Sequence, residues 1–566
     1  MTAPTNSSVP ALLRTPPFAG LEDGALPPPP CIATQLSASS REELFKTLRE
    51  ARVGGAFWAP GCKLEAKPQT VLRPRKKTEF AALQDQFEGQ GNIWIARNAS
   101  LSRISAMVCG PQVDPWSILP QAERLVAHGD DEWVPLARIL GLPVYLLSAG
   151  PFGGPDDTDD ALDAKAGLAL AQPMRDPFAD GWLEPVQAIA LLSEWRRIID
   201  GNRGGAGEKI VAAYGMSWWK RTEIRRFLWL PERPLQFALT ATGALSMARK
   251  NAGALAVWPS RISPDLVSRA REKGVPLVRV EDGFVRSAGL GSNLVPPSSV
   301  VVDRSGIHFD PSKTSDLEAI LASAEFSPAV LERARRLREA IIAARISKYS
   351  KGKSPDSRRL RVGEQRIVLV PGQVENDMSV LAGGGGITSN LELLRRTRKL
   401  VPDAQIWWRP HPDVDAGHRV GAIPDDKALQ YADRIVRDNS IADLLDQVDE
   451  LHVLTSLTGF EALLRGRRVT CHGTPFFAGW GLTCDLAEVP DRRGRNLALD
   501  ELVAGVLLLY PRYLDPVTGL PCPPEILIRR MAQDDMFNRQ SWIEPLRRMQ
   551  GRFVSRFRAG QARKQT

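Results

Sequence analysis

The sequence predicts an α/β protein in which two Rossmann-type domains face a cleft, preceded by a smaller α/β region. Apolar runs typical of buried strands alternate with segments of helical periodicity along most of the 566 residues. Two of these runs, 275–280 and 404–408, are followed at once by the polar clusters Glu281-Asp282-Gly283 and Arg409-Pro-His-Pro-Asp413. Polar residues just beyond the carboxyl ends of strands are typical of ligand sites in open α/β sheets.

Composition and periodicity divide the chain into five segments. The first is rich in Pro, Ser and Thr and is expected to be disordered, and the second alternates strand and helix signals up to a Gly-rich linker. The third and fourth are the two Rossmann-type halves, which a basic, Ser-rich connector separates, and the fifth is a basic tail. Their boundaries are 1–43, 44–200, 208–345, 362–530 and 531–566.

The second segment contains a degraded copy of part of the fourth. Asn98 stands where His411 does in the other copy, and Asp130 stands where Ser456 does. We therefore predict a half-module that keeps the scaffold, lacks the chemistry and has a structural or regulatory role; a chance resemblance between two αβ units is the alternative. The corresponding segments are 93–98 with 406–411, and 118–154 with 444–479 given a short gap.

Cysteine and histidine usage argues against a metal site. The six cysteines are scattered without a CxxC pair, so neither structural zinc nor a disulfide framework is expected, and a reducing compartment fits. The histidines other than His411 show no metal-ligand spacing and are interpreted as structural. The N-terminus does not resemble a signal peptide and no apolar run reaches 18 residues, so we expect a cytoplasmic protein without a membrane span.

The net charge of +9 is unevenly distributed. Residues 547–566 hold seven Lys or Arg and no acid, with Phe553 and Phe557 four residues apart, as in an interfacial helix on anionic lipid; a solvated tail is the alternative. The basic-aromatic stretch 217–229 could contact a membrane or an acidic substrate, or could simply hold half-buried Trp with Arg reaching to solvent. Acids interspersed elsewhere disfavour nucleic-acid binding.

The two polar clusters differ in chemistry. The first supplies carboxylates, and the second supplies a histidine beside an arginine. This combination suits the displacement of a phosphate leaving group from a sugar better than redox or hydride chemistry.

Five motifs in order resemble those of the capsule-polysaccharide β-Kdo transferases of the KpsC type, over about 210–530. The resemblance implies a GT-B-like, CMP-Kdo-dependent enzyme that retains anomeric configuration. It would build a poly-Kdo linker on lyso-phosphatidylglycerol or phosphatidylglycerol at the inner face of the inner membrane. The motifs are Val280-Glu-Asp-Gly-Phe-Val-Arg-Ser-Ala-Gly-Leu-Gly-Ser292, Pro371-Gly-Gln-Val-Glu-Asn-Asp-Met-Ser379, Arg409-Pro-His-Pro-Asp-Val414, Thr455-Ser-Leu-Thr-Gly-Phe-Glu-Ala-Leu-Leu464 and Pro475-Phe-Phe-Ala-Gly-Trp-Gly-Leu-Thr483.

This chain departs from the family plan in one respect. Typical members carry two complete transferase modules in tandem, one for each of two linkages. Here only 208–530 resembles a complete module, and it is most similar to the second of the pair. Synthesis of both linkages by this chain is therefore in doubt. In that module 208–345 would be the acceptor side and 362–530 the CMP-sugar side.

The resemblance assigns roles to the acidic residues. Retention by double displacement needs a carboxylate nucleophile and a separate proton carrier. Asp377, which matches the family's Asn-Asp-Met-Ser motif, is the predicted nucleophile. Glu281 is the predicted acid/base, with Asp282 as the other candidate. Asp377 or Glu281 could instead merely cap a turn.

The leaving group CMP would be bound without a metal or other cofactor. His411 and Arg409 supply side chains, Thr455 and Ser456 suit a phosphate-binding loop, and Glu461 resembles the acid that GT-B enzymes place on ribose hydroxyls. Arg286 and Ser287 could hold the sugar carboxylate. The predicted CMP-Kdo-binding residues are Arg409, His411, Pro412, Thr455, Ser456, Thr458, Glu461, Arg286 and Ser287.

Two other functions compete with the Kdo transferase. One is a transferase for another CMP-activated acidic sugar of the sialic acid type, and the other is a non-catalytic capsule-assembly or export protein. The favoured interpretation implies CMP-Kdo, a phosphatidylglycerol-based glycolipid, the inner-membrane surface and other capsule synthesis or export proteins as partners.

Overall fold

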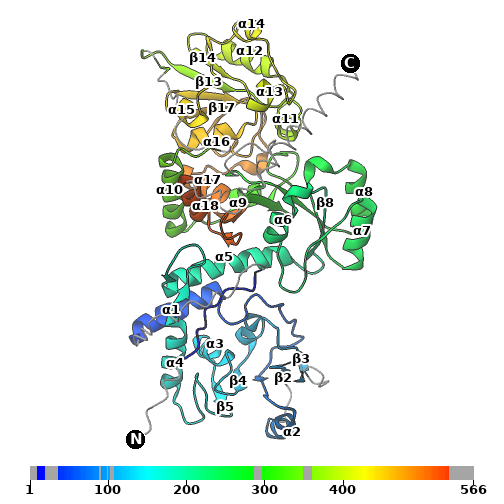
Figure 1. The fold of residues 1–566 in the computed structure, drawn as a ribbon, viewed down its shortest axis with the longest axis vertical. Coiled ribbons are helices and arrows are strands. Elements are labelled where there is room, and N and C mark those ends of the chain that lie inside the picture. Colours follow the sequence, from blue (N-terminus) through cyan, green and yellow to red (C-terminus); the bar gives the residue numbers. More distant parts are fainter. Residues whose placement is uncertain are drawn as a thin grey trace. The chain divides into compact units, whose positions relative to one another are not determined.

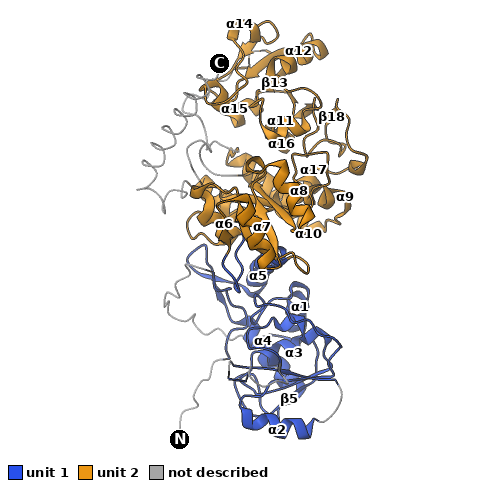
Figure 2. Ribbon diagram, turned by 90° about the vertical axis from the view of Figure 1, so that its right-hand side faces the viewer, with its two compact units in different colours: residues 1–203, 228–234 blue, residues 204–227, 235–566 orange. Residues whose placement is uncertain are grey.

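The chain forms two compact units in a computed structural model (Figure 2). Unit 1 comprises residues 1–203 and 228–234, and unit 2 comprises 204–227 and 235–566. The basic tail from 534 onward and most of 1–43 lie outside the described residues. The structure describes residues 9–18, 36–87, 91–98, 100–101, 107–285, 296–347, 360–361 and 363–533.

Unit 1 is built on a five-stranded parallel sheet with the order β3-β2-β1-β4-β5 (Figure 1). Its strands are β1 (Thr70–Leu72), β2 (Asn92–Ile95), β3 (Met107–Cys109), β4 (Arg124–Ala127) and β5 (Val144–Leu146), with a short hairpin of β6 (Met174–Arg175) and β7 (Trp182–Leu183). Its helices are α1 (Ala38–Ala51), α2 (Lys77–Gln86), α3 (Trp133–Ile139), α4 (Asp159–Ala171) and α5 (Pro185–Arg203).

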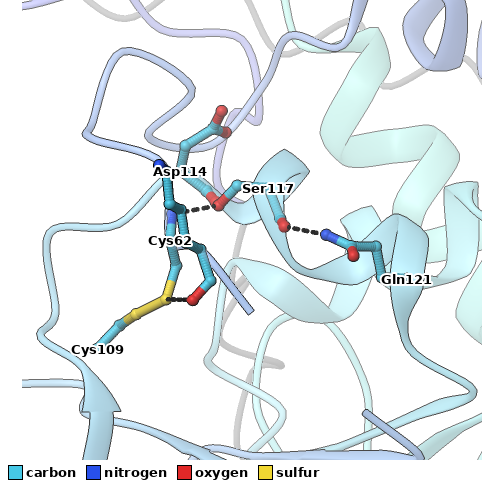
Figure 3. Close-up of a disulfide and its surroundings, with 6 residues drawn as sticks. Cys62, Cys109, Asp114, Ser117 and Gln121 are labelled. Atoms are coloured by element: carbon cyan, nitrogen blue, oxygen red, sulfur yellow. Dashed lines mark hydrogen bonds between the residues drawn. A yellow bond between two sulfur atoms is a disulfide. The ribbon is translucent and has the colours of Figure 1, made fainter. Parts of the chain in front are cut away.

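A single disulfide joins Cys62 to Cys109 in unit 1, a pair that the sequence, which predicted no disulfide framework, did not indicate (Figure 3). The two cysteines lie 47 residues apart, and a single pair at this spacing carries no sequence signature. The fold brings them together because Cys109 ends β3 while Ser117 Oγ holds the Cys62 backbone NH at 2.9 Å. Ser117 in turn donates to the Asp114 carbonyl at 2.7 Å.

The first domain of unit 2 contains a seven-stranded mixed sheet with the order β20-β19-β12-β11-β10-β8-β9. Strands β9, β8, β10 and β11 are mutually parallel, and the remaining three are antiparallel to their neighbours. The bounds in sequence order are β8 (Ile210–Tyr214), η4 (Trp218–Lys220), α6 (Arg221–Phe227), β9 (Gln236–Phe237), α7 (Ala241–Lys250), β10 (Ala254–Val257), η5 (Pro259–Arg261), α8 (Pro264–Glu272), β11 (Leu277–Asp282), β12 (Ser299–Asp303), α9 (Asp316–Ser323) and α10 (Pro328–Ala343).

The second domain of unit 2 contains a six-stranded parallel sheet with the order β15-β14-β13-β16-β17-β18. Every residue of β13 and β16 is buried, as expected when helices cover both faces of a parallel sheet. The bounds are β13 (Ile367–Pro371), α11 (Met378–Gly383), α12 (Asn390–Leu400), β14 (Gln405–Arg409), α13 (Pro412–Asp415), α14 (Asp425–Ala428), β15 (Arg434–Ile435), α15 (Ile441–Leu445), β16 (Glu450–Val453), α16 (Leu457–Leu464), β17 (Arg468–Cys471) and β18 (Cys484–Asp485).

After β18 the chain returns to the first domain. It forms α17 (Leu499–Val503), a π-helical turn (Ala504–Leu509), β19 (Pro511–Leu514), β20 (Pro521–Cys522) and α18 (Pro524–Ala532). Strand β19 pairs antiparallel with β12. The first sheet is therefore completed by residues that follow the whole second sheet in sequence, and these two domains cannot be divided at one point. The predicted α/β class, with several parallel strands, is confirmed.

A cluster of buried polar side chains is formed by β16, β17 and the residue after β17 in the second sheet of unit 2. His452 Nδ1 is 3.0 Å from His472 Nε2, and Glu450 Oε1 is 3.1 Å from His452 Nε2 and accepts a hydrogen bond from Thr470 at 2.9 Å. Burial lowers the pKa of His472 to about 4, and the nearby His452 and Arg396 act in the same direction. Burial alone would raise the pKa of Glu450, but hydrogen bonds from His452, Arg366 and Thr470 lower it to about 2.

Two classes of feature are absent from the described part of the chain. No three His, Cys, Asp or Glu side chains there are arranged to hold a metal ion. No helix among those residues is both long and apolar enough to cross a membrane.

We predict that mild acid destabilises unit 2 through His472. Its folded-state pKa of about 4 lies below the ordinary value of 6.5, so the unfolded chain takes up the proton first. Titration of His472 does not lower the free energy of unfolding above pH 6.5. As the pH falls toward 4, this titration lowers the free energy of unfolding by about 3 kcal/mol in total. Glu450 adds a loss only below about pH 4.5. Urea-unfolding midpoints between pH 8 and 5 measure the effect. His472→Gln should flatten the curve, whereas His418→Gln, at an exposed position, should not.

Candidate functional site

A cavity of about 870 Å³ in unit 2 is lined by side chains from both of its domains. It lies at the carboxyl ends of β11, β13, β14 and β16, where the sequence placed the polar motifs. Arg286 and Ser287, predicted to hold the sugar carboxylate, lie outside the described residues. The other predicted site residues all line the cavity: Glu281, Asp282, Asp377, Arg409, His411, Pro412, Thr455, Ser456, Thr458 and Glu461.

The carboxylates Glu281 and Asp282 form the end of β11. They face Val301 and Val300 of β12 in the antiparallel register, so the central sheet fixes their backbone. Gly283 follows because β12 passes very close: a Cβ at Gly283 would lie 2.2 Å from Ser299 Oγ. Its amide donates to the Ser299 carbonyl at 3.0 Å.

Asp377 is the N-cap of α11. Its Oδ1 accepts hydrogen bonds from the Ser379 amide at 3.0 Å and from Ser379 Oγ at 2.7 Å. The capping role considered from the sequence is therefore real. Both bonds use Oδ1, so capping fixes the orientation of a carboxylate that also lines the cavity.

A hydrogen-bond network connects Asp377 to the loop after β16. Ser379 Oγ lies 3.3 Å from Thr455 Oγ1. The Gln373 side chain holds Thr455 twice, donating to Thr455 Oγ1 and accepting from the Thr455 amide, each at 2.9 Å. Ser456 then caps α16 by accepting from the Thr458 amide at 3.3 Å. The loop therefore presents hydroxyls and amides at a helix N-terminus, which is chemistry that suits an anionic group.

His411 caps α13 with its Nδ1, which accepts from the Asp413 amide at 3.2 Å. When the ring is neutral, its single proton therefore lies on Nε2. Arg409 donates to the carbonyls of Val436 and Arg437 after β15. Burial lowers the pKa of Arg409, although a guanidinium remains charged at neutral pH. Its guanidinium is thus partly occupied by the main chain.

Aromatic side chains from both domains pack at one wall of the cavity. Phe284 follows the Glu-Asp-Gly motif and lies 4.7 Å from Phe476 of the second domain and 4.9 Å from His308, between ring centroids. His308 and Arg419 also line the cavity and were not predicted as site residues, because neither lies in one of the five motifs. Gln373 and Phe476 line it too, and both lie inside these motifs, so the sequence did contain a signal for them.

Unit 1 repeats the strand order and direction of the second sheet of unit 2, as the predicted repeat requires. Asn98 follows β2 and accepts from the Ser100 amide at 3.1 Å, as His411 does from Asp413 after β14. Alignment of the two sheets by strand register corrects one predicted correspondence. Asp131, rather than the predicted Asp130, occupies the position in unit 1 that Ser456 occupies in unit 2. The Trp133 amide donates to Asp131 Oδ1 at 3.1 Å, as Thr458 does to Ser456.

Asp131 gives unit 1 a different electrostatic character at this position. Its carboxylate is fully buried and accepts from Arg73 at 2.8 Å, and Arg97 Nε lies 3.1 Å away. Arg73 is also buried and stacks 4.0 Å from the Trp133 ring centroid. Where unit 2 has a neutral hydroxyl, unit 1 therefore has an anion that its own arginines neutralise.

Comparisons with known proteins show the family to which this chain belongs. The family model described as "Capsule polysaccharide biosynthesis protein" matches residues 253–513. The "Lipopolysaccharide-processing protein LpsZ" of Rhizobium meliloti is 38% identical over 335 residues, 58% of this chain and 76% of that protein. This chain belongs to the capsule polysaccharide biosynthesis protein family. The region that matches the family model includes all of the predicted site residues, whereas the copy in unit 1 lies outside it.

Two further proteins are similar to this chain, one curated relative and one solved structure. The "Capsule polysaccharide modification protein LipA" of Neisseria meningitidis serogroup A is 43% identical over 320 residues, 56% of this chain and 45% of LipA. The chain thus spans less than half the length of that relative. The solved β-Kdo 2,4 transferase of Thermosulfurimonas dismutans KpsC is 30% identical, with a TM-score of 0.50, covering 57% of this chain and 98% of that one.

We predict different costs at the two equivalent cap positions. Asp131→Ala leaves Arg73 buried beside an empty site and should destabilise unit 1 by about 3–5 kcal/mol. Ser456→Ala removes only a neutral cap and should cost unit 2 about 1 kcal/mol. Limited proteolysis in increasing urea, with fragments identified by mass spectrometry, shows which unit opens first. Equal losses for the two variants would contradict the assignment.

Proposed function

We propose that this chain is a retaining β-Kdo glycosyltransferase that moves Kdo from CMP-Kdo to a (lyso)phosphatidylglycerol-linked poly-Kdo acceptor in capsular polysaccharide biosynthesis. The observation that carries the proposal is the single cavity that joins Glu281, Asp282 and Asp377 to His411 and the Ser456 loop. The similarity of this protein to a solved β-Kdo 2,4 transferase, at 30% identity and covering 98% of that transferase chain, supports the same proposal.

The proposed architecture is GT-B-like. Residues 208–345, together with the returning segment from 499 onward, form the acceptor side, and the preceding part of 362–530 forms the CMP-sugar side. Residues 44–200 are a degenerate, non-catalytic half-module. We place the protein peripherally at the inner face of the inner membrane, with glycolipid acceptor and other capsule synthesis or export proteins as partners.

The proposed reaction has two displacement steps at one anomeric carbon. An oxygen of Asp377 forms a bond to that carbon while the bond to the CMP phosphate breaks, and CMP leaves with the electron pair. The acceptor hydroxyl then gives its proton to Glu281 and attacks the same carbon, and Asp377 leaves as a carboxylate. Two inversions retain the configuration. The Ser456 loop and His411 stabilise the departing phosphate, without a metal ion.

A second candidate is a transferase for another CMP-activated acidic sugar such as a sialic acid. The residues proposed to bind the phosphate, His411 and the Ser456 loop, would not distinguish one CMP-activated sugar from another. A third is a capsule-assembly binding protein that lacks catalysis. Release of CMP by the full chain from CMP-Kdo or CMP-sialic acid, with a Kdo-primed acceptor, separates the three. Release from CMP-Kdo alone supports the proposal, and release from neither donor favours the binding protein.

We predict that Asp377→Asn lowers kcat by at least about 1000-fold, because it removes the nucleophile while retaining an oxygen for the α11 cap. Intact-mass spectrometry of the wild type with CMP-Kdo should show a covalent sugar adduct that the variant lacks. Ser379→Ala is the control for lost positioning and should reduce activity far less. An adduct that persists in Asp377→Asn would assign the nucleophile to another residue.

We predict that His411→Asn weakens CMP binding by about 10-fold or more, because it removes a ring donor to a charged group. Asn can still cap α13, as Asn98 caps the equivalent turn in unit 1. Folding should therefore be preserved, which thermal unfolding checks. Titration calorimetry with CMP measures the affinity. Unchanged affinity would show that His411 serves only as a cap.

A further inference from the structure

Arg261 lines the cavity from the first domain of unit 2, on the same wall as Glu281 and Asp282. It ends η5, the short helix that follows β10 and contacts β11. Its side chain is exposed, and it forms no hydrogen bond or ion pair with any residue that the structure describes. Arg261 lies outside the five motifs, so the sequence did not predict it as a site residue.

The fold holds the base of the Arg261 side chain in place. Its amide donates to the Trp258 carbonyl at 2.9 Å, which closes the turn after β10. Gly215, directly after β8, has a φ of 80°, and a Cβ there would lie only 3.0 Å from Arg261 Cβ. The glycine therefore leaves room for the arginine stem. A fixed base reduces the conformational entropy that the side chain loses when its guanidinium binds a ligand.

The charges of this wall decide which ligands can approach it. Among the described lining residues of the first domain, Arg261 is the one Lys or Arg, whereas Glu281 and Asp282 are both acids. An acidic ligand that approaches ionised carboxylates is repelled unless a cation lies nearby. Ser260, the exposed neighbour of Arg261, adds a hydroxyl to the same wall. A guanidinium beside a hydroxyl is a donor set that suits a carboxylate.

The opposite wall has cations of its own. Arg409 donates to main-chain carbonyls, whereas the exposed Arg419 forms no side-chain hydrogen bond or ion pair within the described part of the chain. The Arg419 amide donates to the Asp413 carbonyl at 3.1 Å, so Arg419 lies on the loop that follows the helix capped by His411. The two available guanidiniums thus come from opposite domains. One lies on the side proposed for the CMP-sugar, and the other lies on the side proposed for the acceptor.

We propose that Arg261, with Ser260, binds the carboxylate of the terminal acceptor sugar and so places an acceptor hydroxyl beside Glu281. This inference rests on the proposed transferase function, in which the acceptor itself ends in an acidic sugar. Arg261 is then a specificity-determining residue, because its guanidinium favours an acidic acceptor over a neutral one at a wall that carries two acids. The ion pair forms away from the reacting atoms, and Arg261 neither gains nor loses a proton.

The test is steady-state CMP release by the full chain, with a Kdo-primed acceptor that carries a neutral aglycone. Arg261→Gln should raise the KM for this acceptor by about 10-fold or more, because a charge-assisted hydrogen bond is lost. The KM for CMP-Kdo and the melting temperature should not change. An unchanged acceptor KM would overturn the proposal. An equal rise in the KM for CMP-Kdo would assign Arg261 to the donor and would overturn it as well.

Two other arginines control for a general loss of positive charge. Arg271→Gln removes an exposed guanidinium of α8, which lies in the same domain but outside the described cavity lining, and should leave every constant unchanged. Arg419→Gln removes the guanidinium of the opposite wall and should leave the acceptor KM unchanged. If Arg419→Gln raised the acceptor KM as much as Arg261→Gln does, the effect would be general and the proposal would be wrong.

Changes to the acceptor identify the group that Arg261 binds. An acceptor whose terminal carboxylate is reduced to a primary alcohol should have a KM about 10-fold higher with the wild type. Arg261→Gln should add little to that increase, because both changes remove the same contact. Independent, multiplying effects would show that Arg261 contacts another part of the acceptor. A variant effect that appears only with a phosphoglycerol aglycone would assign Arg261 to the lipid phosphate. Either result overturns the proposal.

Acceptor binding in the absence of donor separates this inference from the proposed function. Saturation-transfer NMR compares binding of the Kdo-primed acceptor to the wild type and to Arg261→Gln. Weaker binding by the variant, together with a wild type that releases no CMP, would reject the transferase and support the acidic-sugar site. Equal binding by the two proteins would overturn the site, whether or not the wild type is active.

Discussion

The cavity of unit 2 has two walls because the chain returns to the first domain after completing the second sheet. Pairing of β19 with β12 adds the returning strand to the sheet that presents Glu281 and Asp282. Tyr510, just before β19, donates to the buried Asp303 at 2.8 Å at the end of β12. Burial raises the pKa of Asp303, with the help of the nearby Asp316, and it raises the pKa of Tyr510 well above its usual range. This hydrogen bond, together with the pairing of β12 and β19, ties the returning segment to the first sheet.

Helix capping is the local device that orients the site. Asp377, His411 and Ser456 each follow a buried parallel strand, and each side chain accepts a backbone amide two residues ahead. A short polar side chain at a strand end satisfies one orphan donor of the next helix and is held against the cavity. A single side chain can therefore cap a helix and also line the cavity. Asp377 shows this most clearly, because its bonds with Ser379 connect it to Thr455 and so to the loop proposed to bind phosphate.

The sequence predicted the parts of the site that depend on local chain geometry. A polar motif after an apolar strand must lie at the carboxyl edge of the sheet, which is why Glu281, Asp377, His411 and Ser456 reach one cavity. It did not predict features that depend on strand order. Lys220 Nζ donates to Asp282 Oδ1 at 2.8 Å only because β8, β10 and β11 are neighbours, and Cys62 reaches Cys109 only because the segment before β1 passes the end of β3. The prediction matched Asp130 instead of Asp131 to Ser456 for a similar reason. In a weak sequence repeat, the position of the alignment gap is determined by the register of the strands in the sheet.

The two copies of the parallel sheet differ in the residues that follow the same strands. Both keep the strand order, the caps after the second strand and the short helix after the fourth. They differ at the helix start, where Asp131 of unit 1 supplies a carboxylate and Ser456 of unit 2 supplies a hydroxyl. A carboxylate repels a phosphate at the place where a hydroxyl and free amides would bind it. Burying that carboxylate then requires Arg73 and Arg97, which would otherwise be available to an anionic ligand. In unit 1 this position is therefore a closed structural contact, because Arg73 and Arg97 of the same unit neutralise the buried carboxylate.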